Sequence, residues 1–210
     1  MESKLLSDYY EKFQKERHKN GTVRISERLL FIKNEVGQQR RVIELGCRFG
    51  SIIELFYENN DVTGVDIDNN ALEICRKKFP NISLLNCNLN SGLPFDDHSF
   101  DVVVITEVLE HLPYTDITLS EIQRILKPGG KIVGSVPNAT RLRNRLRFLS
   151  KGIVERDPTH LIHFSSRSLY KKLSLYFDNV EVHPIASRFL FLSKNMFANY
   201  LLFKGKRKCF

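Results

Sequence analysis

The stretch Arg41–Ser51, RVIELGCRFGS, constrains the fold of this chain more than any other part of the sequence. A short apolar run ends in Glu44 and Gly46, and Gly50 follows four positions after the first glycine. This pattern is typical of a buried strand that turns sharply into a helix. Glycine lets the backbone turn without a Cβ and lets the helix begin close to the sheet, so that backbone amides face a ligand. The turn therefore predicts a cofactor-binding site, and the alternative is an ordinary strand-to-helix turn.

The next predicted strand, residues 61–68, ends in two carboxylates, Asp66 and Asp68. They follow Gly46 by about 20 residues, which is the distance at which an acid meets ribose hydroxyls in a nucleoside-binding unit. We expect Asp66 to bind the ribose. Asp68 is the second choice, because it also suits the N-cap of a helix beginning at Asn69.

Strands and helices alternate regularly along the chain, which predicts right-handed crossovers and a parallel sheet. The fold class is α/β: a Rossmann-like, doubly wound, mostly parallel seven-stranded sheet with helices on both faces and an antiparallel last strand. The expected strands lie at 41–45, 61–68, 82–87, 100–106, 131–136, 179–184 and 198–203, and the expected helices at 2–19, 26–36, 51–59, 70–79, 116–126, 141–150 and 166–176.

A chain of 210 residues with 42% hydrophobic content is long enough for one α/β domain, here 1–210. Within it we expect a helical cap at 1–38, a cofactor-binding core at 39–137, and an acceptor-side segment with the last strands at 138–210. Tyr9, Tyr10 and Phe13 would either cover the cofactor or pack in the core. The four cysteines form no C-x-x-C pair and no signal peptide or membrane span is visible, so the expected localisation is cytoplasmic.

The net charge is +8, and basic residues crowd the segment Arg141–Lys151. As a helix, this segment places Leu142, Leu146 and Leu149 on one stripe. Such a helix would contact anionic lipid or a phosphorylated substrate, and the protein would then be peripheral at a membrane surface. The alternative is a docked helix whose leucines face the core and whose arginines are solvated.

Four further segments follow in order: LPFDDHSFD at 93–101, EVLEH at 107–111, RILKPGG at 124–130 and VPN at 136–138. With the glycine turn, they resemble the type 11 branch of the class I S-adenosylmethionine (SAM) methyltransferases (EC 2.1.1 class), which act largely on small molecules. Glu44, Gly46 and Gly50 match the family's acid-x-Gly-x-Gly-x-Gly motif, whereas Arg48 replaces the middle glycine. Residues 157–168 loosely resemble methyltransferases of sugar, polysaccharide and lipid biosynthesis.

The resemblance implies SAM as the cofactor and assigns residues to it. Glu44, Gly46 and Gly50 would line the methionine end, and Asn88 would accept a hydrogen bond from the adenine amine through its amide oxygen. The full set of expected cofactor-binding residues is Glu44, Gly46, Cys47, Gly50, Asp66, Ile67, Asn88, Leu89 and Glu107.

The expected catalytic residues lie where the methyl group and the acceptor would meet: Glu107, Glu110, His111 and His160. Carboxylates and imidazoles there can take a proton from an acceptor hydroxyl. Alternatively, Glu110 and His111 hydrogen-bond to backbone and support a corner. A similar Glu-x-x-Glu-His run in ubiquinone-pathway O-methyltransferases is associated with a divalent metal. Asp157, His160 and His163 match no recognised zinc pattern, however, and no metal site is predicted.

The leading interpretation is an enzyme that transfers a methyl group from SAM to a small acceptor, at an oxygen of a sugar, lipid-linked or quinone-type metabolite. The first alternative is a non-catalytic partner or scaffold module, because Arg48 and Asn88 depart from the family pattern. An RNA methyltransferase is the second, on account of the charge of +8. No appended RNA-binding domain supports it, and the aromatics are not interleaved with the basic run, so nucleic acid is disfavoured. The sequence identifies neither the acceptor, nor the target atom, nor the oligomeric state.

Overall fold

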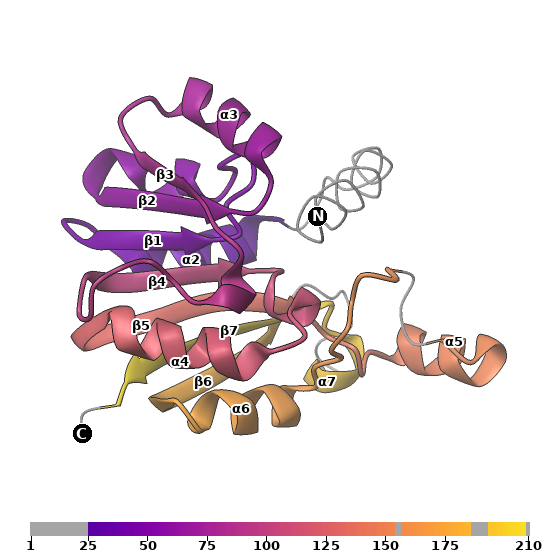
Figure 1. Cartoon of the computed structure of the whole chain (residues 1–210). Helices are drawn as coiled ribbons and strands as arrows, with labels where there is room; N and C mark the ends of the chain where they lie inside the picture. The colour runs from indigo at the N-terminus through magenta and orange to yellow at the C-terminus, as the bar shows by residue number, and fades with distance from the viewer. Residues whose placement is uncertain (1–24, 154–156, 186–192, 209–210) are drawn as a thin grey trace.

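A single seven-stranded sheet forms the centre of the molecule (Figure 1). The structure, a computed structural model, describes residues 25–153, 157–185 and 193–208. The strands run in the order β3-β2-β1-β4-β5-β7-β6, and β7 is antiparallel to both of its neighbours. Their bounds are β1 Arg41–Leu45, β2 Asp61–Asp66, β3 Ser83–Asn86, β4 Phe100–Thr106, β5 Leu126–Pro137, β6 Phe177–Ile185 and β7 Tyr200–Arg207. The predicted doubly wound fold with a reversed last strand is confirmed.

The helices cover both faces of this sheet (Figure 1). The described helices are α2 Ile25–Val36, α3 Asn69–Lys78, α4 Thr115–Ile125, α5 Leu142–Lys151, α6 Ser166–Ser174 and the short α7 Lys194–Phe197, and of these α5 does not pack on the sheet. Apolar residues of α2 and α3 pack on one face, and those of α4 and α6 pack on the other. No described helix is long and apolar enough to cross a membrane.

Strand β4 explains why the sheet is covered on both sides. Val103 and Ile105 belong to one hydrophobic core, and Val102 and Val104 belong to the other. All four side chains are fully or almost fully buried. An uninterrupted β-branched run therefore marks a central strand with helices on both faces.

The segment after Gly50 differs from its prediction. Residues 51–59 were expected to form an α-helix, but they form two short 3-10 turns, η2 Ile53–Leu55 and η3 Tyr57–Asn59. Phe56, with φ −142°, interrupts them. Ile53 and Phe56 are buried against the sheet. β-Branched and aromatic residues such as Ile53 and Phe56 lose side-chain freedom in an α-helix, so their helix propensity is low. Two short turns can bury both side chains, and the segment therefore adopts these turns in place of a regular helix.

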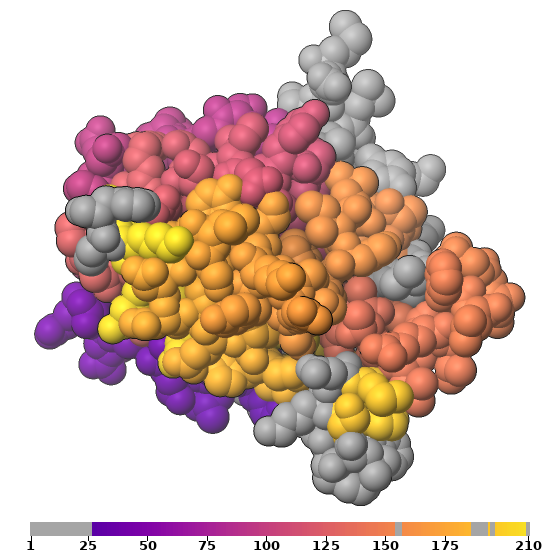
Figure 2. All heavy atoms as spheres, turned by 90° about the horizontal axis from the view of Figure 1, so that it is seen from below, coloured from indigo at the N-terminus to yellow at the C-terminus, as the bar shows by residue number. Residues whose placement is uncertain are grey.

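Helix α5 also corrects an expectation. Both views show it projecting from the body (Figures 1 and 2). Asn144 is its one described buried residue, whereas Leu146 is 56% exposed and Leu149 is 81% exposed. The alternative in which these two leucines face the core is therefore wrong. The Nδ2 amide of Asn144 donates to the carbonyl of Asn138 at 3.4 Å, so a polar contact seats the helix.

Two predictions at the N-terminus lie outside the described residues. These are the helix at 2–19 and the placement of Tyr9, Tyr10 and Phe13 over the cofactor. Of the predicted cap 1–38, the structure describes α2 alone, whose Ile32 and Val36 are buried against the sheet.

Candidate functional site

A cavity of about 580 Å³ opens at the carboxyl ends of the strands. It is lined by the turn after β1, by the residues that follow β2, β3 and β4, and by residues 159–161. Ligands of doubly wound sheets bind at this edge, where the strand order reverses between β1 and β4. All four expected catalytic residues border the cavity, and so do all the expected cofactor-binding residues except Gly50.

Gly50 serves the packing of the turn instead of lining the cavity. A Cβ at this position would lie 2.6 Å from Cε2 of Phe79 and 2.8 Å from Sγ of Cys75. Gly46 differs, because it borders the cavity and a Cβ there would lie 2.4 Å from Cγ2 of Val108. Both glycines have positive φ, at 78° for Gly46 and 74° for Gly50. The first glycine is thus required by the cavity wall and the second by the neighbouring helix α3.

Arg48 occupies a backbone conformation that glycine favours. Its φ is +46°, in the left-handed region that costs an ordinary residue free energy. Its guanidinium carbon lies 4.9 Å from the centre of the Phe49 ring, and both residues line the cavity. The arginine therefore keeps the backbone path of a glycine-rich turn and adds a charged side chain to the wall.

Glu44 is a buried carboxylate at the end of β1. Its side chain borders the cavity at 1% exposure. Burial raises its pKa well above the ordinary value, and the nearby Cys75 and Asp66 raise the pKa further. Among the described residues, its Oε2 is buried without a hydrogen-bond partner. A carboxylate in this state is a strong attractor for a cationic ligand group.

The two carboxylates at the end of β2 make different contacts, since Asp66 binds loop backbone and Asp68 caps a helix. Asp66 accepts hydrogen bonds from the backbone N–H of Arg48 and of Asp68, each at 2.9 Å. Burial raises the pKa of Asp66, while these two backbone donors act in the opposite direction. Asp68 accepts from the N–H of Asn70 and Ala71 and is the N-cap of α3. Asp66 thus fits the expected ribose contact better, and Asp68 takes the capping role that was its alternative.

Asn88 and Leu89 border the cavity just beyond β3. The Asn88 amide oxygen accepts from the backbone N–H of Asn90 at 3.0 Å and from its side-chain amide at 3.2 Å. The same oxygen is the one expected to accept a hydrogen bond from the adenine amine. It already caps the 3-10 turn at 89–91, so the adenine amine would share it with that turn. Leu89 is buried and presents an apolar wall.

Glu107 stands at the end of β4 with φ +54°. The hydroxyl of Ser135 donates to its Oε1 at 2.8 Å, and Nη1 of Arg28 lies 3.7 Å from the same oxygen. The guanidinium of Arg28 also lies 5.2 Å from the centre of the Tyr200 ring. Sequence reasoning missed Arg28 and Tyr200 as cavity residues, because neither lies in a recognisable motif and only the fold brings α2 and β7 to β4.

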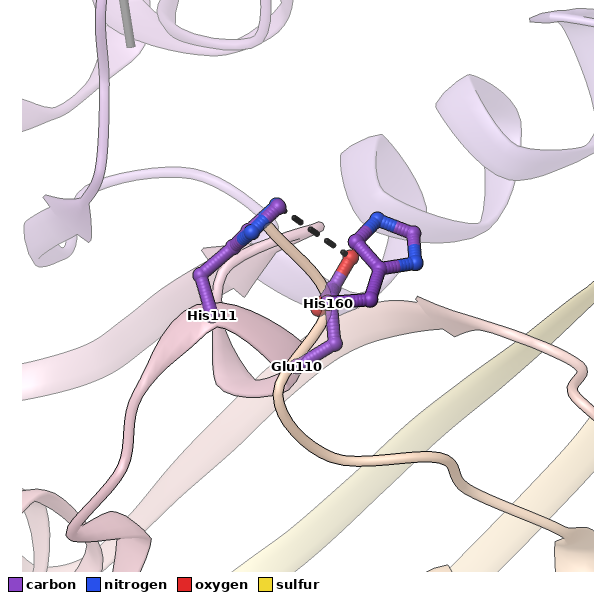
Figure 3. Close-up of side chains that lie close together, drawn as sticks. All are labelled: Glu110, His111 and His160. Atoms are coloured by element: carbon purple, nitrogen blue, oxygen red, sulfur yellow. Dashed lines mark ion pairs between the residues drawn. The ribbon is translucent and has the colours of Figure 1, made fainter. Parts of the chain in front are cut away.

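Glu110, His111 and His160 lie close together (Figure 3), and all three line the cavity. Nε2 of His111 lies 3.9 Å from Oε1 of Glu110, and the two imidazole centres are 4.8 Å apart. The loop carrying His160 is held there because the N–H groups of Leu161 and Ile162 donate to the carbonyl of Glu110, at 2.8 and 3.0 Å. The structure therefore brings together the Glu110–His111 corner and the loop that carries His160, two segments that are far apart in the sequence.

His163 does not join this cluster, since it is exposed and does not line the cavity. Cys47, Cys75 and Cys87 are free thiols, as expected. Cys47 lines the cavity, and a hydrogen bond with Cys75 together with burial raises the pKa of its thiol.

Comparison with known families gives one domain match. The family model described as "Methyltransferase domain" matches residues 43–134, which run from β1 through most of β5. The matched segment contains the turn after β1, the Asp66 loop and the Glu107–His111 run.

Curated relatives share part of their length with the chain. A sterol 4-C-methyltransferase of Caenorhabditis elegans, strm-1, is 33% identical over 107 residues, covering 48% of this chain and 32% of that protein. A demethylmenaquinone methyltransferase of Staphylococcus aureus is 30% identical over 129 residues, covering 52% of this chain and 53% of that protein. The chain thus spans about a third to a half of the length of these relatives.

Solved structures share the fold over nearly the whole chain. A SAM-dependent methyltransferase of Archaeoglobus fulgidus superposes with a TM-score of 0.68 at 22% identity, covering 94% of this chain and 99% of that chain. A SAM-dependent methyltransferase of Thermotoga maritima gives 0.68 at 18% identity, covering 98% and 97%. At this identity the likeness concerns the fold.

Proposed function

We propose that this chain, which carries a class I SAM-dependent methyltransferase domain, transfers a methyl group from SAM to an oxygen of a small, lipid-like or lipid-linked acceptor. One observation carries the proposal. A single cavity joins the buried acids at the ends of β1 and β2 to the Glu107 and Glu110–His111–His160 wall beyond β4. The residues expected to hold the cofactor and those expected to meet the acceptor therefore line one common cavity.

The residues at the first end fit the cofactor. The buried Oε2 of Glu44, without a hydrogen-bond partner among the described residues, would be satisfied by the amine of an amino-acid group. Asp66 is placed to accept from ribose hydroxyls, and Leu89 offers an apolar surface to a base. The volume lies within the range of sites that enclose drug-sized ligands.

The main task of the protein in this reaction is to position the methyl donor and the acceptor. SAM, when bound, supplies an electrophilic methyl group. Transfer is an in-line displacement, so the walls must hold donor and acceptor collinear and keep water out. Nδ1 of His111 lies 3.0 Å from the carbonyl oxygen of Thr159, which favours the tautomer with its proton on Nδ1. The lone pair of Nε2 then points toward Glu110, and the acceptor proton would be released at this wall.

The acceptor class follows from two features. Apolar side chains of Val108, Leu112 and Leu161 border the same wall as the polar cluster, which suits a largely hydrocarbon acceptor with one hydroxyl. The curated relatives are named for sterol and demethylmenaquinone acceptors, and both names denote lipid-like molecules.

Helix α5 supports a membrane-surface location for this reaction. Its seated side carries Asn144, and by helical spacing the stripe of Leu142, Leu146 and Leu149 points nearly the opposite way. Arg143 and Arg145 flank the stripe and are exposed. An outward apolar stripe between basic residues suits the interface of an anionic bilayer. We propose that α5 rests on such a surface and brings the cavity to a membrane-held acceptor.

The test begins with the cofactor. Purified protein is titrated with SAM and with S-adenosylhomocysteine by calorimetry, and we expect binding at micromolar levels or tighter. Absence of both heat and thermal stabilisation would contradict the proposal and favour a non-catalytic module. A methyl-transfer assay with labelled SAM against lipid extracts, water-soluble metabolites and RNA then identifies the acceptor fraction. Label appearing in RNA instead would favour the RNA methyltransferase alternative.

A further inference from the structure

Thr159 lies on the loop beside the ring of His111. The Thr159 hydroxyl donates to Oδ1 of Asp157 at 2.5 Å, and the backbone N–H of Thr159 donates to the same oxygen at 3.0 Å. Thr159 is 6% exposed and Asp157 is 9% exposed, so both residues are buried. A hydroxyl has one proton to donate, and the Thr159 oxygen therefore offers only lone pairs to a further partner.

That further partner is Nδ1 of His111. This nitrogen lies 3.0 Å from the hydroxyl oxygen and 3.0 Å from the carbonyl oxygen of Thr159. Both oxygens act as acceptors here, so a neutral His111 carries its proton on Nδ1. Nε2 is then the ring nitrogen with the lone pair, and one loop residue selects this tautomer through two oxygens.

The loop that carries Thr159 is itself fixed to the corner after β4. The N–H groups of Leu161 and Ile162 donate to the carbonyl of Glu110, at 2.8 and 3.0 Å. These backbone bonds place the two Thr159 oxygens beside the ring, so the contact does not depend on a mobile surface side chain.

The ring of His111 is also held from the side. The His160 ring lies edge-on to it, with 4.8 Å between the ring centres and 70° between the planes. Nε2 of His160 lies 3.5 Å from Oδ2 of Asp157, so one carboxylate contacts both the Thr159 hydroxyl and the second imidazole. Nε2 of His111 lies 3.9 Å from Oε1 of Glu110. A proton taken up at Nε2 would therefore lie near a carboxylate, which stabilises the positive ring.

We propose that Thr159 is a positioning residue, which holds His111 in the tautomer that takes the proton of the methyl acceptor at Nε2. His111 and Thr159 both border the cavity. The role of His111 as the base rests on the proposed function. Among the four expected catalytic residues, His111 is then the one that removes the proton.

In the reaction the O–H bond of the methyl acceptor breaks and its proton passes to Nε2 of His111. An oxygen lone pair forms the bond to the methyl carbon, while the carbon–sulfur bond breaks with its electron pair on sulfur. The products are the methyl ether, S-adenosylhomocysteine and a positively charged His111, which returns the proton to water. The proton on Nδ1 stays with Thr159 throughout, so the base needs no ring rotation between cycles.

The first experiment identifies the tautomer apart from activity. Full-length protein labelled with ¹⁵N-histidine is measured by long-range ¹H–¹⁵N NMR at about pH 8.5, where an unperturbed imidazole is neutral. The His111 signals are those missing from His111→Asn. We expect a protonated Nδ1 and an unprotonated Nε2.

Thr159→Val removes the hydroxyl but keeps the backbone carbonyl and the branched shape. One of two acceptors is lost, so exchange of the Nδ1 proton with water should become about fivefold faster. Thr159→Ser should exchange as wild type does. The amide protons of Leu161 and Ile162 should exchange at the wild-type rate in both variants, which separates loss of the contact from loosening of the loop.

Thr140→Val is the matched control. The hydroxyl and the N–H of Thr140 both donate to Oδ1 of Asn138, at 2.8 and 3.1 Å, as those of Thr159 do to Asp157. Thr140 does not border the cavity, so its variant should leave the Nδ1 proton of His111 at the wild-type exchange rate.

Methyl transfer gives a second measurement, with labelled SAM and the acceptor fraction identified above. Thr159→Val should lower kcat about fivefold and leave the KM for SAM unchanged, and Thr159→Ser should restore kcat. His111→Asn keeps a side-chain N–H near the position of Nδ1 but has no Nε2. It should lose about a hundredfold or more in kcat.

Two results would overturn the proposal. One is a wild-type His111 whose proton lies on Nε2. The other is Thr159→Val protein whose Nδ1 proton exchanges no faster than that of Thr140→Val. Thr159→Ala replaces Thr159→Val if the latter fails to fold.

SAM binding separates this inference from the proposed function. Thr159→Val should bind SAM as wild type does, because Thr159 is not among the expected cofactor residues. An Nδ1-protonated His111 in protein that binds no SAM would leave the tautomer standing and remove the methyltransferase function. SAM binding with an Nε2-protonated His111 would do the reverse.

Discussion

The backbone N–H of Arg48 donates to Oδ2 of Asp66 at 2.9 Å and thereby ties the turn after β1 to the end of β2. The bond requires the path that residue 48 takes at φ +46°. One carboxylate therefore both shapes the glycine-rich turn and lines the cavity. The arginine at this position costs conformational energy without breaking the connection.

Replacing Arg48 tests this cost. In Arg48→Ala the Cβ remains in the left-handed region, whereas Arg48→Gly relieves it. A non-glycine residue pays about 1–2 kcal/mol there, and glycine loses about 0.5–1 kcal/mol of chain entropy. We expect Arg48→Gly to be more stable than Arg48→Ala by about 0.5–1 kcal/mol in urea unfolding. An alanine variant equal to or more stable than the glycine variant would show that the left-handed cost at position 48 does not exceed the chain-entropy cost of glycine.

Asp66→Ala should weaken SAM binding by about 1.5–3 kcal/mol, because a charged acceptor for hydroxyl groups is lost. Asp68→Ala should instead lower the free energy of unfolding by about 1 kcal/mol through loss of the α3 N-cap, with a smaller effect on SAM affinity. Calorimetry and urea unfolding of both variants check the pair. Affinity that falls in Asp68→Ala but holds in Asp66→Ala would exchange the two roles.

Gly46→Ala and Gly129→Ala form a matched pair, because both glycines have φ +78°. A Cβ at Gly129 meets nothing within 4 Å, whereas one at Gly46 would lie 2.4 Å from Cγ2 of Val108. Both variants pay the left-handed cost, and Gly46→Ala pays an additional overpacking cost of about 1–3 kcal/mol. Thermal unfolding that places the two variants at the same stability would show that Val108 moves aside freely.

Glu44 predicts a pH dependence of stability. Its folded pKa is raised by burial above the value of 4.5 that an unperturbed glutamate has. The unfolded chain therefore loses this proton at a lower pH than the folded chain. The contribution of Glu44 to stability is full below the unfolded pKa and falls as pH rises from there toward the folded pKa.

Glu44→Gln removes this titration. The free energy of unfolding of the variant, relative to wild type, should therefore increase as pH rises above the ordinary glutamate pKa of 4.5. Urea unfolding of both proteins at a series of pH values above 4.5 provides the measurement. A difference that stays constant with pH would mean that Glu44 titrates alike in the folded and unfolded states.

The membrane role of α5 is tested with vesicles. Arg143→Gln with Lys151→Gln should weaken binding to anionic vesicles by about 2 kcal/mol, at roughly 1 kcal/mol per basic residue. Arg147 is retained because its Nη1 donates to Oδ1 of Asn144, the residue whose side-chain amide seats the helix on Asn138. Leu146→Ser with Leu149→Ser should weaken binding through lost apolar burial.

Arg76→Gln with Lys77→Gln on α3 is the charge-matched control, since both residues are exposed there. This variant should bind anionic vesicles as wild type does, and neutral vesicles should bind all variants weakly. An equal loss in the control would indicate a general charge effect. Unchanged binding in the α5 variants would make the helix a structural element.

The sequence allowed the sheet to be predicted well because β-branched runs such as Val102–Ile105 are buried on both faces and bounded by turns. Acids and glycines at strand ends also located the cavity, since strand ends meet at one edge of a parallel sheet. The segment after Gly50 could not be predicted, because burial of Ile53 and Phe56 overrode helical spacing.

Local sequence patterns also could not predict the residues that reach the cavity from distant elements. Arg28 on α2 approaches Glu107, and Tyr200 on β7 approaches Arg28, only through the complete sheet order. The approach of His160 to Glu110 depends on two backbone hydrogen bonds, from Leu161 and Ile162 to the carbonyl of Glu110. Backbone hydrogen bonds of this kind leave no side-chain pattern in the sequence from which they could be predicted. The outward direction of Leu146 and Leu149 follows from the seating of Asn144 on the opposite side of the helix. Spacing separates these two sides but does not say which of them faces the body.

The position of β7 between β5 and β6 has a consequence for biosynthesis. Strand β6 is made before β7, yet its one neighbour in the sheet is β7. On the ribosome, β6 must wait until residues 200–207 emerge, and meanwhile β5 presents an unpaired edge. Open edges invite pairing with other chains, so the newly made protein passes through a stage at which chaperone protection matters most.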